Sequence, residues 1–177
     1  MSVLTTSFQG NSLELQLMIH WLKTQRENMA KSIEDEKFQT LSEYDRVKFL
    51  INKRLELNVP IMNKLSEGIS HLMVPYNLSH SLTELHNLGD DIAFYSGDES
   101  NDFAWYSKRF SFSSVYVASE LYMLSDTSKN YTNTKKFVED QVEGVKLLGT
   151  GYENTEQWLF FNSIGLANLI KSQLLRG

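Results

Sequence analysis

The sequence contains no cysteine among its 177 residues. This excludes a disulfide framework, a thiol nucleophile and a zinc site built on thiolates. Proline and glycine are also scarce, at 2 and 9 residues, so the chain lacks the frequent turn signals of a β-sandwich and favours helices. No stretch reaches the ~18 uncharged apolar residues of a membrane-spanning helix. Residues 1–10 contain no Lys or Arg, and we expect neither a secretory signal nor an Arg-rich transit peptide there.

Positive charge is in deficit, because 17 Lys plus Arg stand against 22 Asp plus Glu, for a net charge of -5. Binding to nucleic acid requires a positive field, so we expect no nucleic-acid partner. The patterns Glu-x-x-His, His-Glu-x-x-His and Gly-x-x-x-x-Gly-Lys do not occur, and no Ser-His-Asp or paired-carboxylate arrangement stands out. We therefore expect a protein that is not an enzyme, with no catalytic residues, no bound metal and no cofactor.

Apolar spacing and capping residues predict an all-α domain of about seven helices joined by short connections. The predicted helices are 11–37, 42–58, 60–74, 78–96, 102–124, a segment over 137–148, and 154–175. Gly97 is expected to end the helix 78–96. Apolar residues surround nearly the whole helix 102–124, which is typical of a central, buried helix.

The first turn of the predicted helix 102–124 combines acidic and aromatic side chains. Asn101 or Ser100 can cap it, and Asp102 has Trp105 and Tyr106 as its three- and four-residue neighbours. Local chemistry leaves two interpretations open. The aromatic rings either pack into the core behind an ordinary capped helix start, or form a surface on which a partner docks.

The C-terminal helix also leaves two interpretations open. Residues 157–170 carry no charge, and large apolar side chains lie on both faces of the predicted helix. One interpretation is a core helix that closes the bundle. The other is an interfacial helix that lies on a membrane with its aromatic rings at headgroup depth. The membrane-facing candidates are Trp158, Phe160, Phe161, Leu166 and Ile170.

Several motifs, in this order and spacing, resemble those of the coenzyme Q protein nine family of ubiquinone biosynthesis accessory proteins. They are Met-Val-Pro-Tyr-Asn-Leu-Ser-His-Ser-Leu (73–82), Gly-Asp-Asp-Ile (89–92), Asp-Phe-Ala-Trp-Tyr-Ser-Lys-Arg (102–109) and Ser-Glu-Leu-Tyr-Met-Leu-Ser-Asp (119–126). The ending Asn-Leu-Ile-Lys-Ser-Gln-Leu-Leu-Arg-Gly (168–177) is similar to that of yeast-type members. The resemblance covers essentially the whole chain.

The resemblance implies a tetracycline-repressor-like fold, all-helical and homodimeric. Family members have no known chemistry of their own. They bind lipids, including isoprenoid quinone intermediates, in an apolar pocket. They also bind the di-iron demethoxyubiquinone hydroxylase of the ubiquinone biosynthetic complex. Their C-terminal amphipathic helix associates with membranes, on the matrix side of the mitochondrial inner membrane.

The same resemblance divides the chain into three parts. Residues 1–10 are a disordered or remnant segment, residues 11–152 the lipid-binding domain, and residues 153–177 the membrane-associating helix. Full-length members begin with a transit peptide and a helix-turn-helix unit, and we expect this chain to start near the third helix of that unit, with most of the unit missing.

Matching motif positions place partner-binding residues on two predicted helices. They are Asp91, Ile92, Asp102, Trp105 and Tyr106, where Ile92 replaces a more usual methionine. Arg109 and Glu120 are expected to be internal polar partners. The function implied is a lipid-binding accessory protein that presents quinone intermediates to the hydroxylase. Two alternatives are the ligand-sensing domain of a tetracycline-repressor-like regulator and a di-iron oxidase-like enzyme.

Overall fold

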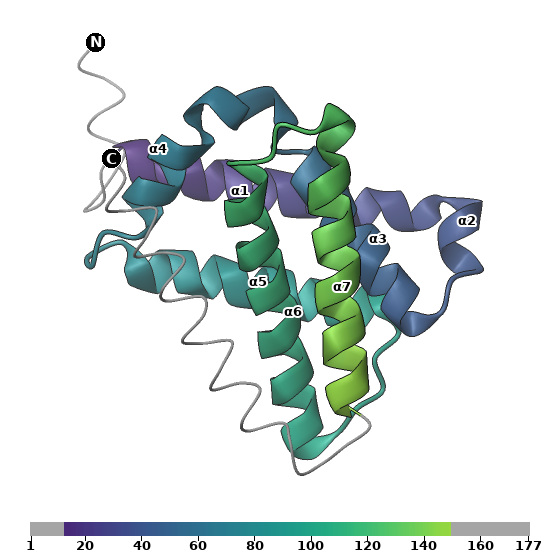
Figure 1. Ribbon diagram of the computed structural model, residues 1–177. Helices are drawn as coiled ribbons and strands as arrows, with labels where there is room; N and C mark the ends of the chain where they lie inside the picture. Colours follow the sequence, from purple (N-terminus) through teal and green to yellow (C-terminus); the bar gives the residue numbers. More distant parts are fainter. Residues whose placement is uncertain (1–12, 150–177) are drawn as a thin grey trace.

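The computed structural model describes residues 13–149, with backbone only for residues 102, 103, 148 and 149 (Figure 1). This part of the chain is all-helical and contains no strand, so the predicted fold class is confirmed. The elements are α1 (Leu13–Lys31), η1 (Ser32–Glu34), α2 (Glu36–Gln39), α3 (Glu43–Glu56), η2 (Val59–Ile61), α4 (Met62–Leu72), α5 (Leu78–Ser96), α6 (Asp102–Met123), η3 (Lys129–Tyr131) and α7 (Thr132–Gly149). The tetracycline-repressor-like topology and the homodimer stay predictions.

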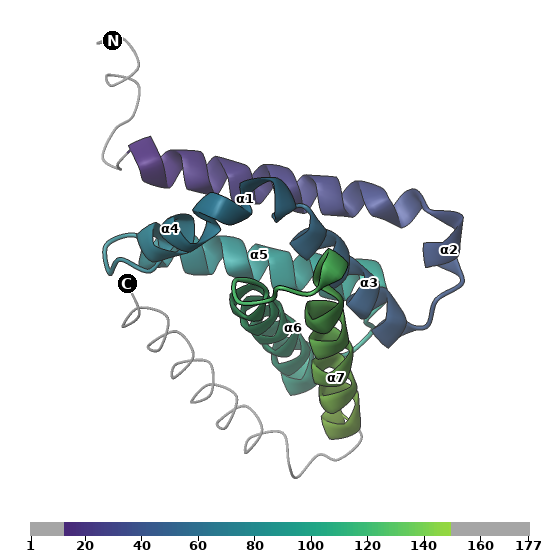
Figure 2. The same cartoon turned by 45° about the horizontal axis from the view of Figure 1, so that its top comes forward.

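Helix α6 lies at the centre of the packing, between α5 and α7. α1 and α5 run side by side, and α6 and α7 together cross them (Figures 1 and 2). Residues 111–116 of α6 are all buried, and Phe112 is fully enclosed by the core. Leu50 and Ile51 of α3 and Ile92 of α5 belong to the same core. The prediction of a central helix over 102–124 is therefore confirmed.

The backbones of α5 and α6 approach closely at Gly89. A side-chain Cβ at this position would clash with Ser113 Oγ and lie 2.8 Å from the carbonyl oxygen of Arg109. The Ser113 hydroxyl is held in place, because it lies 2.9 Å from that carbonyl and 3.3 Å from the carbonyl of Leu85. Small residues on both helices thus set the distance between them.

The prediction of one continuous helix over 11–37 is wrong in its second half. α1 ends at Lys31, and a 3₁₀ turn leads to Asp35, whose extended backbone (φ -65°, ψ 125°) interrupts the helix. The Asp35 carboxylate accepts a hydrogen bond from the Lys37 amide at 2.9 Å and caps α2. An Asp side chain that accepts a hydrogen bond from a nearby backbone amide favours the start of a helix over a helix interior. The break brings Phe38 into the core, where it is 2% exposed.

Other helix ends follow the expected capping chemistry. Gly97 adopts a left-handed backbone (φ 86°) and ends α5, as predicted. The amide of Asp45 lies 3.4 Å from the Ser42 hydroxyl at the start of α3. Asn101 is the N-cap residue of α6, although its side chain makes no capping hydrogen bond. Pro60 lies in the 3₁₀ turn that leads into α4, a first-turn position that proline tolerates.

Candidate functional site

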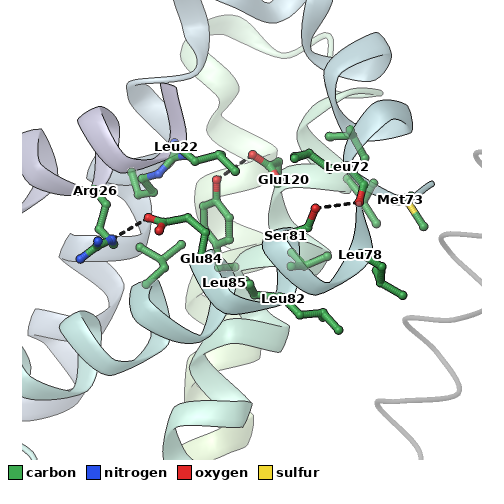
Figure 3. Close-up of a pocket in the computed structure, with 16 residues that line it drawn as sticks. Leu22, Arg26, Leu72, Met73, Leu78, Ser81, Leu82, Glu84, Leu85 and Glu120 are labelled. Atoms are coloured by element: carbon green, nitrogen blue, oxygen red, sulfur yellow. Dashed lines mark hydrogen bonds and ion pairs between the residues drawn. The ribbon is translucent and has the colours of Figure 1, made fainter. Parts of the chain in front are cut away.

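An apolar pocket of about 210 Å³ opens between α1, α4, α5 and α6 (Figure 3). The first half of α5 supplies much of its wall, with Leu78, Leu82 and Leu85 spaced along one face. The same face continues to Gly89 and Ile92, but there it packs against the core. One face of α5 therefore lines the pocket in the first half of the helix and packs against the core in the second half, because α6 crosses α5 at Gly89.

Polar side chains gather at the inner end of the pocket. Tyr116 of α6 donates a hydrogen bond to Glu120 Oε1 at 2.6 Å, and Asn58 Nδ2 donates to the same oxygen at 2.6 Å. Arg54 of α3 in turn donates to Asn58 Oδ1 at 2.7 Å. Burial, together with the Glu120 carboxylate, raises the pKa of the Tyr116 phenol against the opposing charge of Arg54. Tyr116 therefore stays a protonated donor at neutral pH.

One side of the pocket is closed by an ion-pair cluster between α1 and α5. Arg26 Nε lies 2.7 Å from Glu84, and its Nη1 lies 2.6 Å from Asp91. Figure 3 shows Arg26 and Glu84 on the opposite side from Leu78 and Met73. Glu84 is 4% exposed, so its carboxylate depends on Arg26 for compensation.

A second candidate site lies on the surface of α6, close to its start. The rings of Trp105 and Tyr106 meet edge to face, with centroids 4.7 Å apart. The guanidinium of Arg109 stacks on the Trp105 ring at 3.8 Å from its centroid, a cation–π contact. Trp105 is half-buried, whereas Tyr106 is 67% exposed. These two aromatic residues form what we call the aromatic surface, and the guanidinium of Arg109, which is 7% exposed, supports it from beneath.

Buried Asp98 holds the aromatic surface in place. Its side chain is 0% exposed and accepts hydrogen bonds from Lys108 at 2.8 Å and from Arg109 at 3.0 Å. Arg109 also pairs with Asp90 at 2.7 Å. Burial alone would raise the pKa of Asp98, but hydrogen bonds from Lys108 and Ser100 outweigh it and lower that pKa below its ordinary value. The ion pairs with Asp98 and Asp90 hold the Arg109 guanidinium in position, and the guanidinium in turn holds the Trp105 ring.

We expect the Asp98 contribution to stability to disappear in acid. Its pKa is about 4 in an unfolded chain and lower in the folded one, so the contribution is complete above about pH 5 and is lost as the pH falls through the folded value. Asp98→Asn should lower the free energy of unfolding by roughly 3 kcal/mol at pH 7, because two cations lose their buried partner. Urea unfolding at several pH values measures this difference between the wild type and the variant.

The difference in free energy of unfolding between the wild type and Asp98→Asn should shrink below about pH 4, since only the wild type has a carboxyl group that titrates at this position. Asp140→Asn is the control, because the Asp140 side chain is 59% exposed and, among the residues that the structure describes, pairs with Lys136 alone on the surface of α7. Its effect should stay below about 1 kcal/mol. A difference for Asp98→Asn that is the same at pH 3 and pH 7 would contradict the assignment.

The predicted partner-binding residues do not form one surface. Ile92 is 0% exposed within the core, so the prediction that its side chain contacts a partner is wrong for this structure. Asp91 points toward α1, where it pairs with Arg26. Trp105 and Tyr106 lie on the aromatic surface, and their partner role stays a prediction. Asp102 begins α6, but its side chain lies outside the described residues.

Sequence reasoning missed three residues that the two sites depend on. Asp90, rather than its neighbour Asp91, reaches Arg109, because adjacent helical residues point about 100° apart. Asp98, which follows Gly97 in the loop before α6, was not singled out by the sequence analysis. Arg54 was not singled out either, although its four-residue spacing to Asn58 was a visible signal. The prediction that Arg109 and Glu120 are internal polar partners is confirmed.

Other predicted features lie outside the described residues. These are the segment 1–10 and the C-terminal helix with Trp158, Phe160, Phe161, Leu166 and Ile170. Within residues 13–149, no helix combines the length and apolar character needed to cross a membrane. The same residues contain no group of three His, Asp or Glu side chains placed to hold a metal ion.

The described part of the chain is therefore a helical domain built around an apolar pocket with a polar inner end. The COQ9 family model matches residues 78–149, which include α5, α6 and α7. The chain belongs to the COQ9 family, and this confirms the resemblance that its motifs indicate.

Curated relatives carry the name "Ubiquinone biosynthesis protein COQ9, mitochondrial". The protein of Saccharomyces cerevisiae is 42% identical over 131 residues, covering 72% of this chain and 50% of that protein. The protein of Schizosaccharomyces pombe is 36% identical over 128 residues, covering 72% of this chain and 51% of that protein. The protein of Homo sapiens is 30% identical over 141 residues, covering 76% of this chain and 44% of that protein. The chain thus spans about half the length of the curated relatives it matches.

Proposed function

We propose that this chain is a lipid-binding accessory protein of ubiquinone biosynthesis, with no catalytic activity of its own. It binds an isoprenoid quinone intermediate and presents it to demethoxyubiquinone hydroxylase. The observation that carries this proposal is the apolar pocket between α1, α4, α5 and α6. The names of the relatives support the pathway.

The size and position of the pocket suit one end of a long lipid. Its volume of about 210 Å³ is below the ~300–1,000 Å³ of pockets that enclose a whole drug-sized ligand. Leu78 and Leu82 are 41% and 54% exposed, so its wall continues onto the surface as an apolar track. One end of a polyprenyl lipid can therefore occupy the pocket, and the rest of the molecule can follow this track.

The aromatic surface is the proposed docking site for the hydroxylase. Trp, Tyr and Arg are the residues that most often dominate the energy of protein–protein contacts. Here a Trp and a Tyr meet at the start of α6, and the buried guanidinium of Arg109, held by Asp98 and Asp90, fixes the Trp105 ring. A surface that is ordered before binding loses little side-chain entropy when a partner arrives.

The membrane is the proposed source of the lipid. We place the protein in the mitochondrion, peripheral on the matrix side of the inner membrane, and as a homodimer. The supporting observations are the mitochondrial names of the relatives and the uncharged residues 157–170. Flotation on liposomes, with and without residues 154–177, tests the membrane contact.

Mass spectrometry of lipids that co-purify with the full chain tests the pocket. We expect an isoprenoid lipid with the wild type and at least a tenfold lower yield with Leu85→Trp, because the larger ring fills the pocket. The matched control is Leu17→Trp, since Leu17 is 60% exposed on α1 and does not line the pocket. A wild-type protein without isoprenoid or acyl lipid would count against the proposal.

A further inference from the structure

One residue that lines the pocket is a buried cation that no carboxylate of the described residues contacts directly. Arg54 is 1% exposed, and no carboxylate among the described residues lies within 4.0 Å of its guanidinium. Its Nη1 donates to Asn58, but its buried Nε has no hydrogen-bond partner in the described part of the chain. Buried charges in proteins are normally paired, and buried donors normally have acceptors. Arg54 is one of the residues that line the pocket, and an unpaired donor on such a residue points to a ligand.

Two features of the fold stabilise the Arg54 charge without satisfying Nε. Arg54 lies in the last turn of α3, where the helix dipole favours a cation. Its guanidinium also lies 5.3 Å from the centroid of the Tyr116 ring. Neither the dipole nor the ring contact provides an oxygen that accepts the Nε hydrogen. Asn58 and Tyr116 are already engaged with Glu120.

Two of the most buried residues that line the pocket are polar, whereas its most exposed lining residues are apolar. Arg54 and Tyr116 are 1% and 3% exposed, whereas Leu78 and Leu82 at the other end are 41% and 54% exposed. Figure 3 shows Glu120 between Leu22 and Leu72, apart from Leu78 and Leu82. A ligand that matches this gradient has an oxygen-bearing head at its inner end and a hydrocarbon tail at the mouth.

We propose that Arg54 recognises the oxygenated head of an amphiphile, so that the ligand enters the pocket head first and its tail leaves past Leu82. This inference rests on the proposed lipid-binding function and adds the residue that selects the ligand. The Nε–H donates to a carbonyl or carboxylate oxygen, which is the chemistry shared by a quinone ring and a fatty acid. A pure hydrocarbon gains nothing from Arg54.

Equilibrium dialysis with three probes tests the inference on the full chain. The probes are a benzoquinone with a two-unit isoprenoid tail, dodecanoate, and the hydrocarbon of the same isoprenoid tail. Arg54→Met keeps the volume but removes the donor, and it should weaken quinone binding by about 10- to 100-fold. Hydrocarbon binding should change by less than about threefold. Leu85→Trp should weaken all three probes together.

Comparison of the benzoquinone probe with dodecanoate shows whether Arg54 binds a carbonyl oxygen, a carboxylate oxygen or both. A loss with both polar probes supports recognition of any acceptor oxygen, and a loss with one assigns the head to that probe. Equal changes for the polar probes and the hydrocarbon would overturn the role of Arg54 while leaving lipid binding intact. A wild type that binds none of the three probes would overturn the proposed function as well.

A measurement on the wild type keeps the test independent of the variant's folding. Intermolecular NOEs from the quinone ring protons should reach the ring of Tyr116 when the head lies inside. NOEs from the same protons to the methyl groups of Leu82, with the tail protons near Tyr116, would show the reverse orientation and overturn the inference. Both residues line the pocket, at its inner end and its mouth.

Discussion

Trp105→Lys is expected to abolish co-purification of demethoxyubiquinone hydroxylase with this protein. The change replaces the largest ring of the aromatic surface by a cation and places it beside Arg109, whose guanidinium now stacks on that ring at 3.8 Å. The variant loses apolar contact area and gains like-charge repulsion at the proposed interface. Central Trp residues of interfaces contribute about 2–4 kcal/mol, which corresponds to a loss of roughly 30- to 1,000-fold in affinity.

Matched variants separate docking from folding. Tyr106→Ala should also weaken the complex, because Tyr106 is 67% exposed and its loss barely affects the core. Tyr76→Lys is the control, since Tyr76 is 75% exposed but lies before α5 and outside the aromatic surface. All three variants should keep the helical circular dichroism signal. If the complex persists with Trp105→Lys, the hydroxylase docks elsewhere.

The position of the aromatic surface links it to the pocket. Both sites use α6: Arg109 lies near its start and Tyr116 two turns later, on the same helix. Both also use α5, which supplies Asp90 to one site and Leu85 to the other. A partner bound at Trp105 therefore contacts the helix whose buried face forms the inner end of the pocket. Arg109 and Tyr116 are seven residues apart and lie about 20° from one another around the helix, so the proposed docking site and the pocket lie on one side of α6, two turns apart.

Helices and their main faces could be predicted from the sequence because local patterns determine them. The apolar residues around α6 require burial on all sides, and Gly97 tolerates the left-handed backbone that ends α5. Arg109 and Glu120 stood out as polar residues on an otherwise apolar helix, and both pair internally. Such patterns depend only on residues within a few turns.

Tertiary contacts explain what the sequence could not predict. The break after Lys31 depends on Phe38 reaching a core built by α3, α5 and α6, a gain that local periodicity does not show. Ile92 could not be assigned to core or surface until α6 was placed across α5. The choice between Asp90 and Asp91 as partner of Arg109 depends on the same crossing. Arg54 could be recognised as buried only once the pocket was closed by four other elements.

Gly89→Ala is expected to destabilise the fold by about 3 kcal/mol, although alanine is the better helix former. The added methyl group would clash with Ser113 Oγ and lie 2.8 Å from the carbonyl oxygen of Arg109. The backbone of α6 cannot yield locally, because Arg109 is tied to Asp90 and Asp98. The helices must separate, which should lower the melting temperature by roughly 6–12 °C in differential scanning calorimetry.

Gly144→Ala is the matched control, with the opposite sign. Gly144 lies inside α7, and a Cβ there would meet nothing within 4 Å. The substitution should therefore stabilise the protein by about 0.5–1 kcal/mol, since alanine loses less backbone entropy in a helix than glycine. The separation of α5 and α6 in Gly89→Ala should also weaken binding of the hydrocarbon probe, because Leu85 and Tyr116 then move apart. Equal melting temperatures for the two variants would contradict the close contact between α5 and α6.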